Sequence, residues 1–376
     1  MKGKSIWIFF ILISFLVLTG CEKEEEVPVK EPTFQELFVG SAECKSCHDT
    51  EYAEFITTGH PYKLNKAADV RAGNYYPYSD VPEPPAGTSW DDVTYVIGGY
   101  GWKARFIGKD GYIITAGGSN QYNLLDGSWS DYHKDEEKPY NCGKCHTTGY
   151  VPEGNQDNLP GIEGTWAFPG VQCEVCHGPG KEHVDDPYKN EMEVDRSSSL
   201  CGKCHVRGDP NAIPAKGGYI RHHEQYNEIL ATKKFNFNCV DCHDPHKSAH
   251  YAEDGTVYST KFDFPEKPGI KIQCSTCHYE KAEALEASDI GKKHTFQRCL
   301  GCHMPYASKS AMARDQHTGD VRTHLFAINT DTTKSMFSDD GSLANGYLTL
   351  EYTCLNSCHS DKDLSWAKSK SDLIHQ

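Results

Sequence analysis

Paired cysteines followed by a histidine are the residues of this sequence whose types and spacing could do chemistry. Of the 17 cysteines, all but Cys21 form eight pairs, and a histidine follows the second cysteine of every pair. Seven pairs are separated by two residues, and the last pair is separated by three. In chain order, and numbered here as motifs 1 to 8, the pairs are Cys44/Cys47, Cys142/Cys145, Cys173/Cys176, Cys201/Cys204, Cys239/Cys242, Cys274/Cys277, Cys299/Cys302 and Cys354/Cys358.

This spacing is typical of covalent haem attachment. The two sulfurs form thioethers to the two vinyl groups of a haem, and the adjacent histidine is held under the iron as its proximal ligand. The histidines in this position are His48, His146, His177, His205, His243, His278, His303 and His359. We therefore expect eight covalently bound haem c groups, one on each motif.

Other chemistries of paired cysteines fit the pattern less well. A zinc site needs no histidine directly after each second cysteine, and two adjacent ligands crowd a tetrahedral ion. A thioredoxin-like dithiol occurs once, near a βαβ pattern. A secreted disulfide framework would show varied spacings and no rule for histidine. For motif 8, a local disulfide between Cys354 and Cys358 remains the alternative to a haem.

The supply of further histidines predicts two imidazoles on each iron. Of the 19 histidines, eight belong to the motifs and eleven lie elsewhere, whereas the chain has five methionines including Met1. We expect distal ligands at His60, His183, His223, His246, His294, His317 and His324, with His250 next. His222 is the alternative to His223, and we expect His133 and His375 to be solvated. Two imidazoles leave no open position on iron, which suits electron transfer more than catalysis.

The apolar composition requires the haems to supply the core. Leu, Ile, Val and Phe make up about 16 % of residues 21–376, and below roughly 20 % with a high net charge composition alone predicts disorder. A buried aromatic side chain covers about 150–250 Å², and a porphyrin exceeds two of these. We therefore expect mainly short α-helices and irregular coil wrapped on haems, with a small antiparallel β insert.

The first residues resemble a bacterial lipoprotein leader. Residues 1–20 have a basic start and an apolar run that is shorter than the roughly 20 residues of a membrane span. They end before Cys21, which in lipoproteins becomes the lipidated first residue. Residues 21–38 are acidic and proline-containing, as expected for a tether. An uncleaved helical anchor or a soluble secretion signal remains the alternative.

Two further regions follow the tether. Residues 39–141 carry motif 1 and then stretches that alternate like strands, 93–99, 102–107 and 112–115, with a turn at 108–111. This insert is expected to cover the first haems, with partner docking as the alternative. Residues 142–376 carry motifs 2 to 8 as an irregular array, with a short helix expected at 281–287 because that segment is rich in Ala, Glu and Leu.

The segments around motifs 1 to 3 resemble the cytochrome c-552/c-554 multihaem family. The resemblance is carried by Cys44-Lys45-Ser46-Cys47-His48 with Thr58-Gly59-His60, by Cys142-Gly143-Lys144-Cys145-His146-Thr147-Thr148-Gly149-Tyr150, and by Gly170-Val171-Gln172-Cys173-Glu174-Val175-Cys176-His177-Gly178-Pro179-Gly180 with His183. It covers most of residues 40–310 and implies stacked and perpendicular haem pairs that transfer electrons outside the cytoplasm. The chain departs from the octahaem hydroxylamine and nitrite enzymes related to this family, because no motif ends in lysine and the sequence after His359 is short.

The charge restricts the class of partner. A net charge of −15 argues against nucleic acid and against an anionic membrane surface as partners, and permits basic redox proteins. We expect an electron relay between a redox donor and a redox acceptor, lipid-anchored in the cell envelope on the periplasmic or outer face. Two other functions stay open. They are the oxidation or reduction of nitrogen or sulfur compounds at one open haem, and assembly of copies of the chain into a conductive filament.

Overall fold

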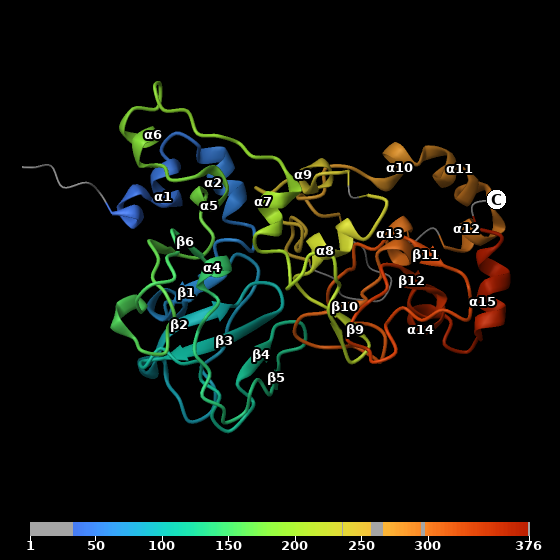
Figure 1. The fold of residues 1–376 in the computed structure, drawn as a ribbon, viewed down its shortest axis with the longest axis horizontal. Helices are drawn as coiled ribbons and strands as arrows, with labels where there is room; N and C mark the ends of the chain where they lie inside the picture. Colours follow the sequence, from blue (N-terminus) through green and yellow to red (C-terminus); the bar gives the residue numbers. More distant parts are fainter. Residues whose placement is uncertain (1–32, 235, 257–265, 295–297, 375–376) are drawn as a thin grey trace, which may run out of the picture. The chain divides into compact units, whose positions relative to one another are not determined.

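The computed structural model describes residues 33–374 except 235, 257–265 and 295–297. The leader, Cys21 and His375 lie outside the described residues. Most elements of the described chain are a single turn or a short strand, joined by irregular segments (Figure 1). Among these residues no helix combines the length and the apolar composition that a membrane span requires.

The helices are short because most of them coincide with one motif. The α-helices are α1 (Ser41–Cys44), α2 (Asp49–Phe55), α3 (Ala67–Arg71), α4 (Gly143–His146), α5 (Glu174–His177), α6 (Lys181–Asp185), α7 (Ser198–Gly202), α8 (Gln225–Leu230), α9 (Cys239–Cys242), α10 (Cys274–Cys277), α11 (Tyr279–Ala287), α12 (Asp289–Lys293), α13 (Arg298–His303), α14 (Asn356–Cys358) and α15 (Leu364–Ser371). Single 3₁₀ turns lie at Phe34–Leu37, Trp90–Asp92 and Gln156–Asn158. The predicted helix at 281–287 is α11, which starts two residues earlier.

One helical turn explains the geometry of each motif. Cysteines three residues apart lie on the same side of a helical turn, so both sulfurs face one haem edge. The histidine that follows then donates its backbone N–H to the first cysteine carbonyl, as in His48 to Cys44 at 2.9 Å and His278 to Cys274 at 3.0 Å. The chain turns away after the histidine, which frees the imidazole to face the haem.

Motif 8 accommodates its extra residue in a wider turn. Glu351–Leu355 is a π-helix that leads into α14, and a π turn is an α turn with one residue inserted. The His359 amide lies 3.2 Å from the Cys354 carbonyl, five residues back, and 2.9 Å from that of Leu355. No disulfide joins Cys354 to Cys358 in the described chain.

The predicted β insert is confirmed as part of a larger sheet. The strands are β1 (Leu64–Lys66), β2 (Val93–Gly98), β3 (Lys103–Gly108), β4 (Gln121–Asn123), β5 (Ser128–Ser130), β6 (Thr147–Thr148), β7 (Phe168–Pro169), β8 (Ala215–Lys216), β9 (Tyr219–Arg221), β10 (Ser308–Lys309), β11 (Ile328–Asn329) and β12 (Leu348–Thr349). β1 to β5 form one antiparallel sheet in chain order. Residues 112–115 make isolated bridges instead of the expected third strand, since Ile113 pairs with Ile107 and Tyr112 with Pro139.

Both faces of this sheet are buried, each by its own apolar cluster. Val96 and Phe106 face a cluster rich in tyrosine, whereas Ile97 and Ile107 face a cluster with Tyr140 and Trp166. A third cluster, which includes Ile220, Leu325 and Leu348, lies among the short strands β8 to β12. These clusters form an apolar framework beside the motifs, so the chain's own side chains supply part of the core.

A buried carboxylate ties the start of the described chain to motif 3. Glu174, 3 % exposed, lies on α5, and its oxygens accept backbone N–H groups from Val39 at 2.9 Å, Gly40 at 2.8 Å and Gly180 at 2.8 Å. Ser41 adds a fourth bond, since its hydroxyl accepts the Cys173 N–H at 3.0 Å. Motifs 1 and 3 are thereby held side by side.

We predict that Glu174→Ala weakens this junction strongly. Three buried N–H groups lose their acceptor, and leaving a buried donor unsatisfied costs about 1–3 kcal/mol each, so the urea midpoint of the haem-loaded protein should fall. Glu174→Gln keeps an acceptor oxygen and should cost less. The exposed neighbour Glu182→Ala is the control; an equal midpoint for Glu174→Ala and Glu182→Ala would contradict the role of this carboxylate.

Candidate haem centres

The structure brings the cysteines of different motifs into contact. Burial raises the pKa of the Cys44 thiol to about 11 and the neighbouring Cys173 thiol adds to this shift, which places motifs 1 and 3 next to each other. Equivalent thiol contacts join Cys145 to Cys204, Cys201 to Cys239 and Cys274 to Cys299. Weaker electrostatic neighbours are Cys176 with Cys201 and Cys204, Cys242 with Cys277, and Cys302 with Cys354 and Cys358.

These neighbours place the motifs in a continuous order. Motif 1 adjoins motif 3, motif 3 adjoins motif 4, and motifs 4 to 8 then follow one another. Motif 2 adjoins motif 4 through Cys145 and Cys204 and stands beside this order. Sequence neighbours are therefore spatial neighbours from motif 3 onward, whereas motif 2 forms a branch.

Five motif histidines face a second imidazole. With metal–imidazole bonds of about 2 Å, two imidazoles on one metal ion have ring centres about 6.3 Å apart. The observed pairs and centre distances are His48 with His183 at 6.4 Å, His205 with His60 at 6.4 Å, His177 with His246 at 6.1 Å, His243 with His324 at 6.2 Å and His359 with His294 at 6.0 Å. The donor set and spacing fit a bis-imidazole haem at each of these five positions.

Hydrogen bonds to the other ring nitrogen support this fit. Backbone carbonyls accept a hydrogen bond from Nδ1 of His183, His294 and His303, each at 2.7 Å. A carbonyl can only accept, so these rings carry their proton on Nδ1 and keep the Nε2 lone pair for a metal. Such bonds orient metal-binding histidines and fix their tautomer.

Two predicted ligands are not brought opposite a motif histidine. The His223 ring lies against His222, with their centres 4.5 Å apart, and Arg207 donates to its Nδ1 at 3.2 Å. His317 packs against Tyr352 at 5.1 Å. As haem ligands, His223 and His317 remain predictions.

His250 and His133 differ in their surroundings. His250 packs between Trp102 and Tyr251, its Nε2 is buried without a hydrogen-bond partner, and burial lowers its pKa to about 3. His133 is the more exposed of the two and pairs with Glu136 at 2.6 Å, in agreement with a solvated role.

The surroundings of motif 2 differ from those of the paired imidazoles. Among the described residues the aromatic ring near His146 is that of Tyr140, 6.4 Å away, and the buried Nδ1 of His146 has no hydrogen-bond partner. Burial, followed by repulsion from Lys63, Arg105 and Lys103, lowers the pKa of His146 to about 3. The imidazole is therefore neutral and available to bind a metal ion.

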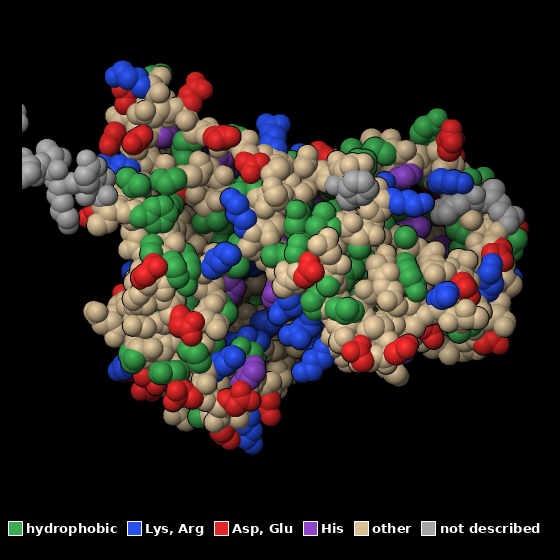
Figure 2. All heavy atoms as spheres, in the orientation of Figure 1, with side chains coloured by type: hydrophobic (Ala, Val, Ile, Leu, Met, Phe, Trp, Pro, Cys, Tyr) green, Lys and Arg blue, Asp and Glu red, His purple; other side chains and the backbone are tan. Residues whose placement is uncertain are grey.

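These cations belong to a larger group that we call the cationic cluster. Its members are Lys63, Lys103, Arg105, Arg207 and Arg221. Figure 2 shows Lys and Arg side chains together with histidines in a hollow of the molecular face. Burial lowers the pKa of Lys103 well below its ordinary value, with Arg105, Arg207 and Arg221 adding repulsion and Asp320 opposing it. The cluster gathers positive charge around motif 2.

Few carboxylates neutralise this cluster. Arg207 forms an ion pair at 2.9 Å with the fully buried Glu224, and burial raises the pKa of that carboxyl to about 7, although Arg207 and Arg221 oppose the shift. Lys103 donates to the Ser310 carbonyl at 2.7 Å, and Arg105 donates to the Gln121 amide oxygen at 2.9 Å. The hydrogen bonds that hold Lys103 and Arg105 in place therefore come from neutral acceptors. Sequence reasoning missed this cluster, although Lys103 and Arg105 alternate along an apolar strand.

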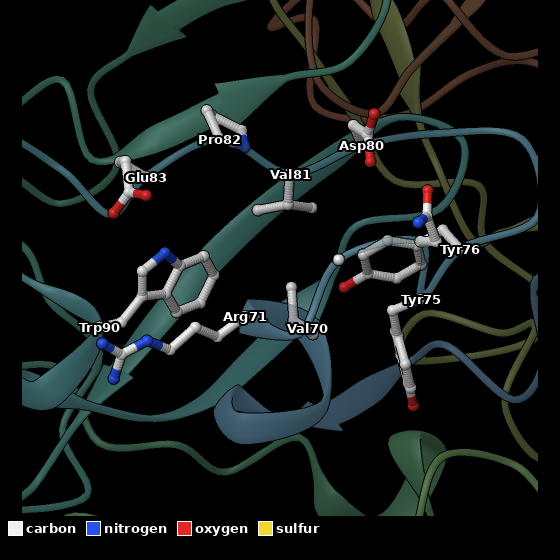
Figure 3. Close-up of a pocket in the computed structure, with 11 residues that line it drawn as sticks. Val70, Arg71, Tyr75, Tyr76, Asp80, Val81, Pro82, Glu83 and Trp90 are labelled. Carbon is white, nitrogen blue, oxygen red and sulfur yellow. The ribbon is translucent and has the colours of Figure 1, made fainter.

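A separate pocket lies between α3 and the segment before β2. In Figure 3, Val70 and Val81 point toward each other across it, and Trp90 lies near Arg71. Arg71 also forms an exposed ion pair with Asp91 at 2.6 Å. The residues that line this pocket include no histidine and no cysteine, so it is separate from the haem centres.

Comparisons with known proteins agree with this chemistry. Residues 119–178 match the model of the family described as cytochrome c554 and c-prime. The chain is 24% identical over 254 residues to the dissimilatory sulfite reductase MccA of Wolinella succinogenes. The matched region covers 53% of this chain and 34% of that protein. It is 24% identical over 199 residues to the multihaem cytochrome MtrA of Shewanella baltica, covering 49% of this chain and 51% of that one. The chain thus spans about a third to a half of these relatives.

Solved structures share the fold. The octahaem sulfite reductase MccA of Wolinella succinogenes superposes with a TM-score of 0.59 at 17% identity, covering 86% of this chain and 65% of the other. The outer cell wall cytochrome OcwA superposes with a TM-score of 0.58 at 19% identity, covering 89% and 86%. With its repeated haem-attachment motifs and short helices, the chain is similar to multihaem c-type cytochromes, and covalent haem c is the cofactor that these motifs fit.

Proposed function

We propose that the chain carries eight covalent haems and conducts electrons along them. The observation that carries this proposal is the continuous order of neighbouring thiols. Each thioether would join a haem edge to its cysteine, so neighbouring cysteines would place two porphyrin edges near each other. The order runs from motif 1 through motif 3 to motif 4 and on to motif 8, with motif 2 as a branch at motif 4.

The imidazole pairs support conduction over catalysis along this order. Five of the haems have two histidines at the spacing of one iron, so ligands change little between oxidation states and no position is open to a substrate. Such haems serve motifs 1, 3, 4, 5 and 8, which include both ends of the order. Electrons can therefore enter at one end and leave at the other.

The same proposal places the protein outside the cytoplasm, anchored by a lipid on Cys21. Its support is the lipoprotein-like leader and the acidic tether of residues 21–38. The partners are a redox donor and a redox acceptor. The name of the related OcwA, an outer cell wall cytochrome, is in keeping with this location.

A second candidate function is reduction of a small anion at the motif 2 haem. Its support is the cationic cluster around His146, together with the absence of an imidazole facing that histidine among the described residues. The related MccA is named a sulfite reductase, which makes sulfite a natural anion to test. The neighbouring motif 4 would supply the electrons.

We predict a count of eight haems in the full-length protein. Intact mass and a pyridine haemochrome assay should agree on this number, and the double variant Cys354→Ser/Cys358→Ser should contain one haem fewer, because motif 8 then has no sulfur. A single Ser357→Ala change within the same motif is the control and should keep eight. A wild-type count below eight would refute the full order.

We also predict an anion-sensitive haem at motif 2. Electron paramagnetic resonance of the oxidised protein should contain a high-spin signal that sulfite changes, and Lys103→Met should weaken sulfite binding about tenfold or more, since a buried charge-assisted bond contributes about 1.5–3 kcal/mol. Lys109→Met, on the exposed turn after the same strand, should leave binding unchanged. If sulfite leaves every signal unaltered, the protein is a relay alone.

A further inference from the structure

Motif 6 has an unusual partner on the iron-binding side of its histidine. In the described chain His278 faces no second imidazole, in contrast to the five pairs above. Instead the Lys234 ammonium nitrogen lies 3.1 Å from His278 Nε2. This contact joins residues that are 44 positions apart in the sequence, so the fold and not chain proximity creates it.

Nε2 is the nitrogen through which a haem-motif histidine is free to bind iron. In His183, His294 and His303 the other nitrogen is engaged by a carbonyl, which leaves Nε2 for iron. At His278, Nε2 is the nitrogen that Lys234 faces. Two ligand atoms on opposite sides of one metal ion lie about 4 Å apart, given bonds of about 2 Å. The Lys234 nitrogen and His278 Nε2 are 3.1 Å apart. This is about 1 Å less than the separation of two opposite ligands, and the flexible four-carbon stem of lysine can supply the difference.

The backbone fixes where Lys234 begins. The Lys234 N–H donates to the hydroxyl of the buried Thr232 at 3.0 Å, and the Lys234 carbonyl accepts from Phe237 at 2.9 Å. The ammonium group also lies 5.1 Å from the centre of the Phe237 ring. No carboxylate of the described chain forms an ion pair with Lys234, so its nitrogen is not committed to another charge.

The neighbouring thiols place this lysine among the haems. Its charge acts on Cys242 of motif 5, and Cys242 in turn neighbours Cys277 of motif 6. Lys234 therefore lies where two haem edges come together, with its nitrogen turned toward the histidine of motif 6.

We propose that Lys234 is the sixth ligand of the haem held by Cys274 and Cys277, opposite His278. The amine binds iron through its lone pair after its extra proton has left to solvent, and no electron is transferred in this step. The inference rests on the proposed haem at motif 6 and deepens it. It gives the electron path one haem with a histidine and an amine among haems with two histidines.

The test uses full-length, haem-loaded protein and near-infrared magnetic circular dichroism, which separates histidine–amine from bis-histidine haems. The wild type should show one histidine–amine haem per chain. Lys234→Ala should lose this band, gain one high-spin haem and, when reduced, bind one more carbon monoxide per chain than the wild type. Lys234→His should restore a low-spin haem of the bis-histidine type.

Lys233→Ala is the matched control, because it removes the adjacent exposed lysine and should leave every signal as in the wild type. The inference is overturned if the wild type lacks the histidine–amine band, or if Lys234→Ala leaves the band and the carbon monoxide count unchanged. The haem number from intact mass distinguishes a failure of the proposed function from a failure of this ligand assignment. A missing motif 6 haem contradicts the proposed function, whereas a full complement without the amine band contradicts this ligand alone.

Discussion

The fold depends on one constraint, the rigid turn that joins two sulfurs and an imidazole. A cysteine at each end of a helical turn and a histidine directly after it fix the position and tilt of whatever binds all three. The chain between such turns is free to be irregular, because the bound group and not a long helix organises the packing. Motif 8 shows how strictly this holds, since its extra residue is absorbed in a π turn that keeps the His359 amide near the Cys354 carbonyl.

Burial of polar groups separates structural from functional positions in this molecule. Three buried phenols of the tyrosine cluster donate to backbone carbonyls: Tyr62 to Ile56 at 2.7 Å, Tyr76 to Gly98 at 3.0 Å and Tyr100 to Thr57 at 2.6 Å. These phenols stay neutral, and their hydrogen bonds join neighbouring segments of the chain. The cationic cluster is different, because gathered like charges carry a desolvation and repulsion cost that an anion can offset. Such a cost, next to a motif histidine, is the physical basis of the anion site proposed for motif 2.

Features that depend on neighbouring residues could be predicted from the sequence, whereas contacts between distant segments could not. The motifs, their single-turn helices and strands β2 and β3 follow from spacing and alternation within a few residues. The partners of the imidazoles do not: His60 faces His205, far along the chain, and His294 faces His359 although Cys299 is closer in sequence. Only the folded backbone sets these distances. Lys234 gave no signal at all, since a lysine in a polar segment is ordinarily solvated, whereas Lys103 and Arg105 were visible as charges on an apolar strand.

The number of neighbours of each proposed haem indicates whether it can relay electrons or face another molecule. A haem inside a chain of neighbours must exchange electrons on both sides, and two firmly held ligands serve that need with little rearrangement. A branch has one neighbour, so its other side can face something else. Motif 2 is such a branch, attached at motif 4 through Cys145 and Cys204, and it is also the motif that the cations surround. The proposed anion chemistry at motif 2 thus has two supports: the place of the motif beside motif 4 and the cations around His146, two of which lie on strand β3.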